Sequence, residues 1–244
     1  MRTSLHAPLA TAVLLASTLA QAGWFGTNES GNGKKVTESR NVRDFKRVVL
    51  KSAIDVEIKR GADFAVRVTT DSNLMPLLIT TVEGDALVIA NKSSGGMRMR
   101  GKNVVAITLP DFRGLSIQGS GDGVVSGFAA ERDVELMVAG SGNIKYEGGA
   151  RGLKVRVEGS GDVKLSGGKA SALEVSVEGS GDVDASGLPA HDVNASIDGS
   201  GDVNVNVTGG NLSAAVNGSG DIVWTGDGKL VSAVKHGSGE ISHR

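Results

Sequence analysis

The sequence predicts an all-β protein that folds as a parallel β-helix, a solenoid of stacked coils. Three observations favour this class. A Gly-Ser-Gly motif recurs seven times at intervals of 19 to 21 residues. Short stretches with alternating apolar and polar residues flank each copy, and no helical period is present. Glycine is abundant (36 residues) while proline is scarce (4 residues), which is typical of many tight turns between short strands.

The N-terminal residues 1–22 have the pattern of a secretory signal peptide. Arg2 supplies positive charge, residues 9–19 form an apolar run, and Ala20-Gln21-Ala22 fits a small-x-small cleavage site. The apolar run is too short to span a bilayer as a helix, and no later segment is apolar enough to do so. We expect cleavage after Ala22 and a mature chain that is periplasmic or secreted.

Composition excludes several classes of function. The formal net charge of −1 argues against a nucleic-acid partner, which needs a concentrated basic face. The chain has no cysteine, which excludes a disulfide framework, a thiol nucleophile and a thiolate metal site. Stability must then come from the core and from hydrogen bonds between strands.

The pattern along the chain divides it into a lead-in and one β-helix domain. Residues 23–35 are rich in Gly, Asn and Ser and are expected to be flexible. The domain covers 36–243. Its first part, 36–111, alternates irregularly and includes a predicted loop at 91–103, and its second part, 112–243, holds the repeats.

Each repeat has the same apolar positions relative to its first glycine. Positions −6, −4, −2, +4 and +6 are apolar, as in Leu153, Val155, Val157, Val163 and Leu165. Each repeat is therefore predicted to be a strand, a tight turn, a strand and a looser turn. About 20 residues cannot bury an apolar face alone, but stacked copies can. A meander of antiparallel hairpins is the alternative; the match of each repeat to the next at a constant interval disfavours it.

The Gly-Ser-Gly motif is predicted to be the corner between two faces of a coil. At least one glycine is expected to have φ > 0, and the acidic residue that follows is expected to close an Asx-type turn. The turn glycines are Gly119, Gly121, Gly140, Gly142, Gly159, Gly161, Gly179, Gly181, Gly199, Gly201, Gly218, Gly220, Gly237 and Gly239. The residues that follow them should stack in one column: Asp122, Asn143, Asp162, Asp182, Asp202, Asp221 and Glu240. The presence of Asn143 indicates that the column needs a hydrogen-bond acceptor more than a charge.

A calcium column is the alternative role for these acidic residues. Stacked like charges repel, and a cation held by Asp122, Asp162, Asp182, Asp202 and Asp221 would relieve the repulsion. The spacing does not match the nine-residue calcium-binding repeat of β-rolls. We therefore expect no metal site and no cofactor.

The repeats resemble those of a known family. The GSGDV-type turns follow an N-terminal part of the form AIDVEIKRG…FAVRVTTDSNL, and together they resemble the bacterial head GIN domain family over roughly 36–242. Proteins of this family are described as autotransporter-adhesin heads. The resemblance implies a right-handed β-helix similar in shape to pectin-lyase-like proteins but without their catalytic residues, and a role in adhesion.

A carbohydrate-active enzyme on this fold is a disfavoured alternative. Glycoside hydrolysis needs two carboxylates in different environments, whereas identical turns give near-identical environments. His191, His236 and His243 each stand alone in polar stretches. We expect no catalytic residues.

The outward positions of the later repeats suggest a binding face. They change from charged residues to a flat Asn/Ser-rich set that is suited to hydrogen-bonding sugars or pairing with another chain: Asn194, Ser196, Asn204, Asn206, Ser213 and Asn217. The predicted function is an exported, non-enzymatic interaction module for adhesion or envelope surface binding, whose partner is a glycan or an envelope protein. A structural envelope scaffold that binds protein partners is the alternative. In the last repeat Lys235 takes an inward position, which is typical of a polar cap against end-to-end stacking, with a docking end as the alternative.

Overall fold

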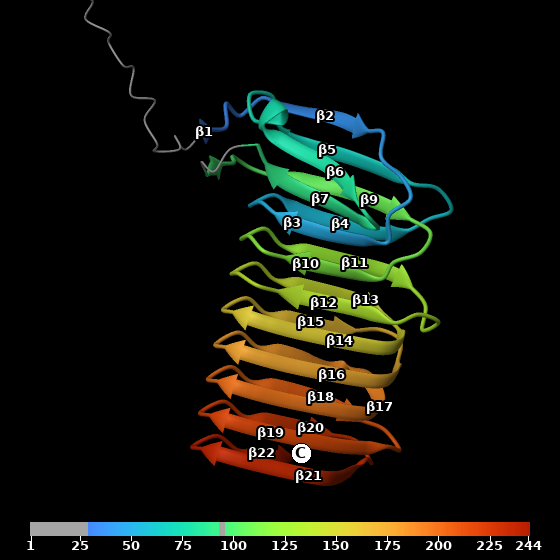
Figure 1. Cartoon of the computed structure of the whole chain (residues 1–244), viewed down its shortest axis with the longest axis vertical. Helices are drawn as coiled ribbons and strands as arrows, with labels where there is room; N and C mark the ends of the chain where they lie inside the picture. Colours follow the sequence, from blue (N-terminus) through green and yellow to red (C-terminus); the bar gives the residue numbers. More distant parts are fainter. Residues whose placement is uncertain (1–28, 93–95) are drawn as a thin grey trace, which may run out of the picture.

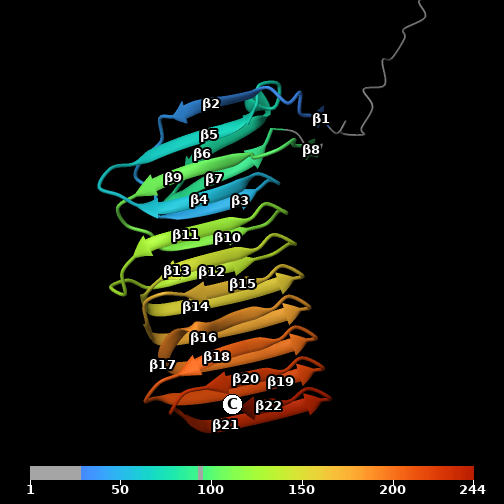
Figure 2. The same cartoon turned by 180° about the vertical axis from the view of Figure 1, so that it is seen from behind.

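The predicted all-β solenoid of stacked parallel strands is confirmed. The computed structural model describes residues 29–92 and 96–244. Figures 1 and 2 show the coils stacked in one column, with β2 (Lys35–Arg40) at one end and the C-terminus at the other. Within the described residues, no helix is long and apolar enough to cross a membrane.

Each repeat contributes one strand to each of two facing sheets. The first sheet contains β10 (Gly114–Ile117), β12 (Val134–Val138), β14 (Ala150–Gly159), β16 (Ala170–Gly179), the second half of β17 (Val183–Gly199), β19 (Asn211–Gly218) and β21 (Lys229–Gly237). The second sheet contains β11 (Gly123–Phe128), β13 (Ile144–Gly148), β15 (Val163–Ser166), the first half of β17, β18 (Val203–Val207), β20 (Ile222–Thr225) and β22 (Ile241–His243). Equivalent residues pair in parallel from coil to coil, as in Val155 with Val175 and Val203 with Ile222.

The coil that precedes the repeats lies inside the stack and not at its end. It consists of β3 (Arg47–Lys51) and β4 (Asp55–Arg60). On one side it pairs in parallel with β10 and β11, and on the other with β7 (Ala86–Asn91) and β9 (Val104–Leu109). The chain therefore forms β3 and β4 first and then adds β7 and β9 on one side of this coil. It returns to the other side of the same coil to begin the repeats with β10 and β11.

Antiparallel pairing occurs only at the N-terminal end among the described strands. There β6 (Leu78–Glu83) pairs with β7, β5 (Ala65–Asp71) pairs with β9, and β2 (Lys35–Arg40) pairs with β5. A short 3₁₀ helix, η1 (Met75–Leu77), connects β5 to β6. Of these strands, β5 and β6 run against the direction of the coils, whereas β2 runs with it, so this end has a different edge from the repeating one.

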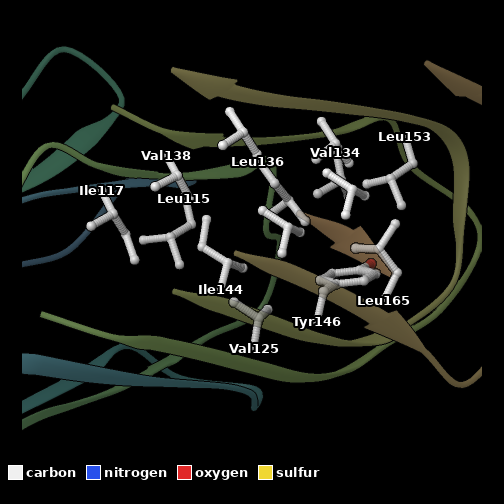
Figure 3. Packing of buried hydrophobic residues seen from close by; sticks show 14 of the residues in the cluster. Leu115, Ile117, Val125, Val134, Leu136, Val138, Ile144, Tyr146, Leu153 and Leu165 are labelled. Carbon is white, nitrogen blue, oxygen red and sulfur yellow. The ribbon is translucent and has the colours of Figure 1, made fainter. Parts of the chain in front are cut away.

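The core lies between the two sheets. Figure 3 shows Leu115, Leu136 and Val138 from the first sheet facing Ile144 and Tyr146 from the second. The inward positions predicted from the repeat are buried: none of Leu153, Val155, Val157, Val163 and Leu165 is more than 2% exposed. Period-two alternation therefore places every second side chain in one continuous aliphatic core.

Part of the expected lead-in and part of the expected loop pair as two short strands. Within 23–35, β1 (Glu29–Ser30) pairs with β8 (Met97–Arg98), which lies inside the expected loop at 91–103. The buried carboxylate of Asp71 joins the two segments, because it accepts hydrogen bonds from the Gly33 and Arg100 N–H groups and pairs with the Lys35 ammonium at 3.2 Å. Burial raises the pKa of Asp71, but these donors outweigh it and hold the pKa below its ordinary value. The predicted signal peptide, 1–22, lies outside the described residues.

Candidate functional site

The turn glycines lie where neighbouring coils come closest. A Cβ built on any of the fourteen would lie no farther than 2.5 Å from a backbone carbonyl oxygen of the neighbouring coil. In the five copies from Gly159 onward, the first glycine also has φ between +118° and +147°. The repeat of Gly-Ser-Gly therefore follows from the stacking of the chain, because residues with a Cβ would hold the coils apart.

The column after each turn is a continuous hydrogen-bond ladder. The side-chain oxygen of each residue accepts the backbone N–H of its equivalent in the next coil, as from Asp202 to Asp182 at 2.8 Å. The ladder runs through Asp122, Asn143, Asp162, Asp182, Asp202, Asp221 and Glu240, with donor–acceptor distances of 2.7 to 3.0 Å. The side chains thus join neighbouring coils, which differs from the Asx turn expected within one coil.

The ladder begins at a residue that the sequence analysis missed. Asp55 accepts the N–H of Asp122 at 3.0 Å, so the turn at Ser52-Ala53-Ile54 is stacked as a Gly-Ser-Gly turn would be. Its signal in the sequence is a hydroxyl residue and an aspartate before a period-two strand. Without glycines, that signal does not stand out.

The predicted binding face is divided between the two sheets, which corrects the expectation of one surface. Asn194, Ser196, Ser213 and Asn217 lie on β17 and β19 of the first sheet, whereas Asn204 and Asn206 lie on β18 of the second: these are opposite faces of the coil. The physical reason is the turn itself. It reverses the chain between Gly199 and Val203, so outward positions before and after it point to opposite sides.

A groove of about 920 Å³ crosses the outer face of the first sheet. Its floor is the outer surface of the sheet at Gly152 and Ala172, whose small size leaves the sheet uncovered; the neighbouring Leu153, Leu173 and Val193 point inward and are 2%, 2% and 4% exposed. The small residues Gly152 and Ala172, which pair between neighbouring coils, are the sequence signal that would have indicated the groove.

The charge of the residues that line the groove changes along the solenoid. At one end ion pairs join Arg47 to Glu135 and Lys154 to Glu174, each at 2.8 Å. At the other end the lining has one carboxylate, Asp192, beside uncharged polar residues: the predicted Asn194 and Ser213 and the unpredicted Asn211. One ligand lying along the groove would therefore meet ionic groups first and amide and hydroxyl groups next.

A carboxylate fixes the polar end of the groove. Asp192 accepts hydrogen bonds from the backbone N–H of Asn211 at 3.1 Å and lies 3.1 Å from Nδ1 of His191. The Asn211 N–H, followed by the His191 ring, holds the pKa of Asp192 below its ordinary value. The side-chain amide of Asn211 also donates to Asp192, at 3.4 Å, so this carboxylate holds Asn211 at the polar end.

A second hollow of about 330 Å³ lies farther along the same sheet. It is lined by Ser196 and Asn217, both predicted, and by Glu178, Asp198 and His236. All four predicted residues of the first sheet therefore line one of the two hollows.

Two of the predicted lone histidines have partners in the structure. His191 pairs with Asp192, and His243 packs on Trp224 with ring centroids 3.9 Å apart. These two histidines are therefore not isolated, which differs from the expectation. Within 29–92 and 96–244, no group of three or more His, Asp or Glu side chains could hold a metal ion.

Solved structures with the same architecture come from bacteria. The chain is 26% identical to a "putative adhesin" from Bacteroides fragilis, with a TM-score of 0.81 over 88% of this chain and 99% of that one. Two proteins of Parabacteroides distasonis share the fold. A "putative lipid binding protein" is 24% identical with a TM-score of 0.74, covering 89% of this chain and 100% of its own. A "putative adhesin" is 23% identical with a TM-score of 0.70 and the same coverage.

The comparison with curated proteins gives no match. The family described as "Putative auto-transporter adhesin, head GIN domain" matches residues 44–228, which is more than half of the chain. The chain therefore belongs to the head GIN domain family.

Proposed function

We propose that the protein is an exported, non-enzymatic module that binds a partner at the cell envelope or the cell surface. The family and the solved relative from Bacteroides fragilis are described as adhesins, which supports an adhesion-like role. The signal-peptide pattern of residues 1–22 supports export with cleavage after Ala22. The mature protein would then act in the periplasm or outside the cell.

The ligand-binding surface in this proposal is the outer face of the first sheet. The observation that carries it is the groove of about 920 Å³ together with the second hollow on the same sheet. A concave surface with a few convergent polar groups is the first place to look for a binding site. Asn194, Asn211 and Ser213 offer both donors and acceptors, which is the chemistry that sugar hydroxyl groups require.

The charges of the groove favour a ligand without strong net charge. Its lining contains four cationic side chains and four carboxylates: Arg47, Arg113, Lys154 and Arg156, and Asp133, Glu135, Glu174 and Asp192. Two of the cations are already paired with carboxylates of the groove. A weakly charged glycan fits this balance, whereas a polyanion such as nucleic acid does not.

A glycan array probed with the purified chain 23–244 tests the proposal, with and without calcium. We expect specific binding to a glycan class, and a loss of about tenfold or more in affinity for Asn194→Leu or Ser213→Leu. Asn204→Leu is the matched control, because the same change is made on the opposite sheet. Equal losses for Asn194→Leu and Asn204→Leu would reject the groove as the site.

A blank array with a correctly folded chain would reject a glycan ligand. It would favour the alternative function, an envelope scaffold that binds proteins.

A further inference from the structure

The turn between β7 and β9 takes the place of a Gly-Ser-Gly turn but is longer. β7 pairs with β3 and β9 pairs with β4, so the residues between Asn91 and Val104 lie one coil from the tight turn at Ser52-Ala53-Ile54. β8 belongs to this turn and pairs with β1. Figure 2 shows β1 and β8 extending beyond the edge of the column. We call the described residues of 29–35 and 92–103 the basic projection.

The basic projection carries six cationic side chains, and two of them are neutralised within the chain. The Lys35 ammonium lies 3.2 Å from the buried carboxylate of Asp71, and the Lys102 ammonium lies 2.9 Å from the carboxylate of Glu57. The other four are exposed and form no ion pair with a described residue: Lys34, Lys92, Arg98 and Arg100.

Few carboxylates are available to balance these four cations. Glu29 is the one carboxylate of the projection itself. Residues 1–28 and 93–95, which lie outside the described part of the chain, contain no Asp or Glu. In the adjoining coil Lys51 and Asp55 carry opposite charges. The projection therefore keeps an excess of positive charge that is exposed to solvent.

Farther along the same line of turns, three successive turns are acidic. They are the turns that begin at Gly159, Gly179 and Gly199. Each has one carboxylate before its first glycine and one in the ladder: Glu158 and Asp162, Glu178 and Asp182, and Asp198 and Asp202. Among the described residues, one of these six carboxylates has a cation beside it, because Nε of Arg156 lies 4.0 Å from Glu158. These turns therefore form a region of strong negative charge.

The stack sets the distance between the two charged regions. The acidic turn at Gly179 lies five coil steps from the projection, along β7, β3, β10, β12, β14 and β16. At about 4.8 Å per step this distance is about 24 Å. Its midpoint lies between the coil of β10 and the coil of β12. The turn after β12 has Ala139 and Asn143 at the two positions that carry carboxylates in the acidic turns, and it is the one Gly-Ser-Gly turn with no charge at either position.

Two copies of the chain that meet along this edge in opposite directions bring the two regions together twice. A twofold axis at the midpoint places the projection of each copy on the acidic turns of the other. The uncharged turn of each copy then lies opposite the turn of Asp122 in the other, so two acidic turns do not meet at the axis. An interface of this kind is self-complementary, because each copy contributes the same surface.

We propose that the chain forms a twofold dimer through its line of turns, in which the basic projection of each copy binds the acidic turns of the other. Opposite charges fix the register and speed the encounter. None of these charged residues lines the groove of about 920 Å³, so the dimer leaves that groove open and does not depend on the glycan ligand proposed above. Glu178 and Asp198 also line the second hollow, so the partner copy would cover the rim of that hollow.

Analytical ultracentrifugation of the chain 23–244 tests the proposal. We expect a dimer at low salt that dissociates as salt is added, because salt screens exposed charges. Lys92→Glu with Arg98→Glu should raise the Kd of the dimer by about tenfold or more, since attraction becomes repulsion. Lys59→Glu with Arg67→Glu is the matched control, because these exposed cations of β4 and β5 lie away from the line of turns.

The acidic turns are reversed by Glu158→Lys with Glu178→Lys, which leaves every acceptor of the ladder in place. This double variant should raise the Kd by about tenfold or more as well. If it does not fold, Asp162→Asn with Asp182→Asn replaces it, since asparagine keeps the acceptor and removes the charge.

A mixture of the two reversed variants tests the pairing itself. The reversed projection of one variant meets the reversed turns of the other, and their unchanged regions also attract each other. We expect the mixture to form a heterodimer with a Kd about tenfold or more below that of either variant alone.

Three outcomes would overturn the proposal. The chain could stay monomeric at low salt at about 0.1 mM. The dimer could survive both reversed variants and high salt, which would assign it to another surface. The mixture could also dimerise no more tightly than either variant alone. For a monomeric chain, binding to vesicles of phosphatidylglycerol but not of phosphatidylcholine would assign the projection to an anionic lipid surface instead.

Discussion

Three glycine-to-alanine substitutions separate the two reasons for which the turns contain glycine. Gly209 has φ of +74° and nothing within 4 Å of a built Cβ, so alanine should cost about 1–2 kcal/mol for the left-handed backbone alone. Gly181 is outside the left-handed region, but its Cβ would overlap the carbonyl oxygen of Gly161, and such overpacking costs about 1–3 kcal/mol. Gly179 combines φ of +134° with a Cβ 2.5 Å from the Gly159 oxygen, so the two costs should add to about 2–5 kcal/mol.

The assay is urea unfolding followed by circular dichroism, with Ser180→Ala as the control in the same turn. Because each coil contacts only its neighbours, parts of the stack can unfold separately. The complete unfolding curves of the variants are therefore compared, and not the signal at one position. We expect Gly179→Ala to lose more stability than either Gly181→Ala or Gly209→Ala. If Gly181→Ala is as stable as the wild type, close approach does not require glycine. If Gly209→Ala loses as much as Gly179→Ala, the backbone angle alone explains the turns.

Three further predictions concern two carboxylates and a buried phenol. Asp182→Ala removes the acceptor of the Asp202 N–H and should lower Tm by about 2–4 °C, whereas Asp182→Asn keeps an acceptor and should leave Tm unchanged. EDTA should also leave Tm unchanged. A fall in Tm of several degrees with EDTA would favour the calcium column. Because the pKa of Asp71 is lowered, its stabilisation is present above the unfolded value of about 3.9 and lost as pH falls through the folded value. Asp71→Asn should therefore flatten the acid side of a Tm–pH curve, and an unchanged curve would contradict this. Burial raises the pKa of Tyr146 to about 12, so its stabilisation should be lost from about pH 10 to about 12. Tyr146→Phe should remove that loss and cost about 1 kcal/mol at neutral pH, because the Gly149 carbonyl loses its donor; a steep alkaline loss that remains in the variant would assign it to another group.

The repeats could be predicted from the sequence because their rules are local. Period two fixes which side chains enter the core, and a constant interval fixes which coils are neighbours. The N-terminal part gave no such signal. The position of β3 and β4 between β10–β11 and β7–β9 depends on pairing between residues far apart in the chain, such as Leu50 with both Ile89 and Ile117. No periodicity records that pairing, and the turn before Asp55 has no glycine to mark it.

The candidate site was predicted only in part for a related reason. The Asn/Ser composition of the later repeats was visible, but the turn that divides these residues between two sheets also decides which of them act together. Asn194 and Ser213 share a groove, while Asn204 faces the other way. The groove itself arises from what is missing at Gly152 and Ala172. Small side chains in register from coil to coil produce a hollow that no single motif announces.

The two sets of positions explain how one fold can serve different ligands. Inward residues and turns carry the core and the coil-to-coil ladder, so they are restricted in size and backbone angle. The outward residues of the first sheet belong neither to the core nor to the coil-to-coil ladder. One outward column changes from Glu135, Lys154 and Glu174 to Asn194 and Ser213 without any change in strand pairing. Because the fold does not depend on that column, its residues are free to be set by the ligand, and we expect binding specificity to reside there.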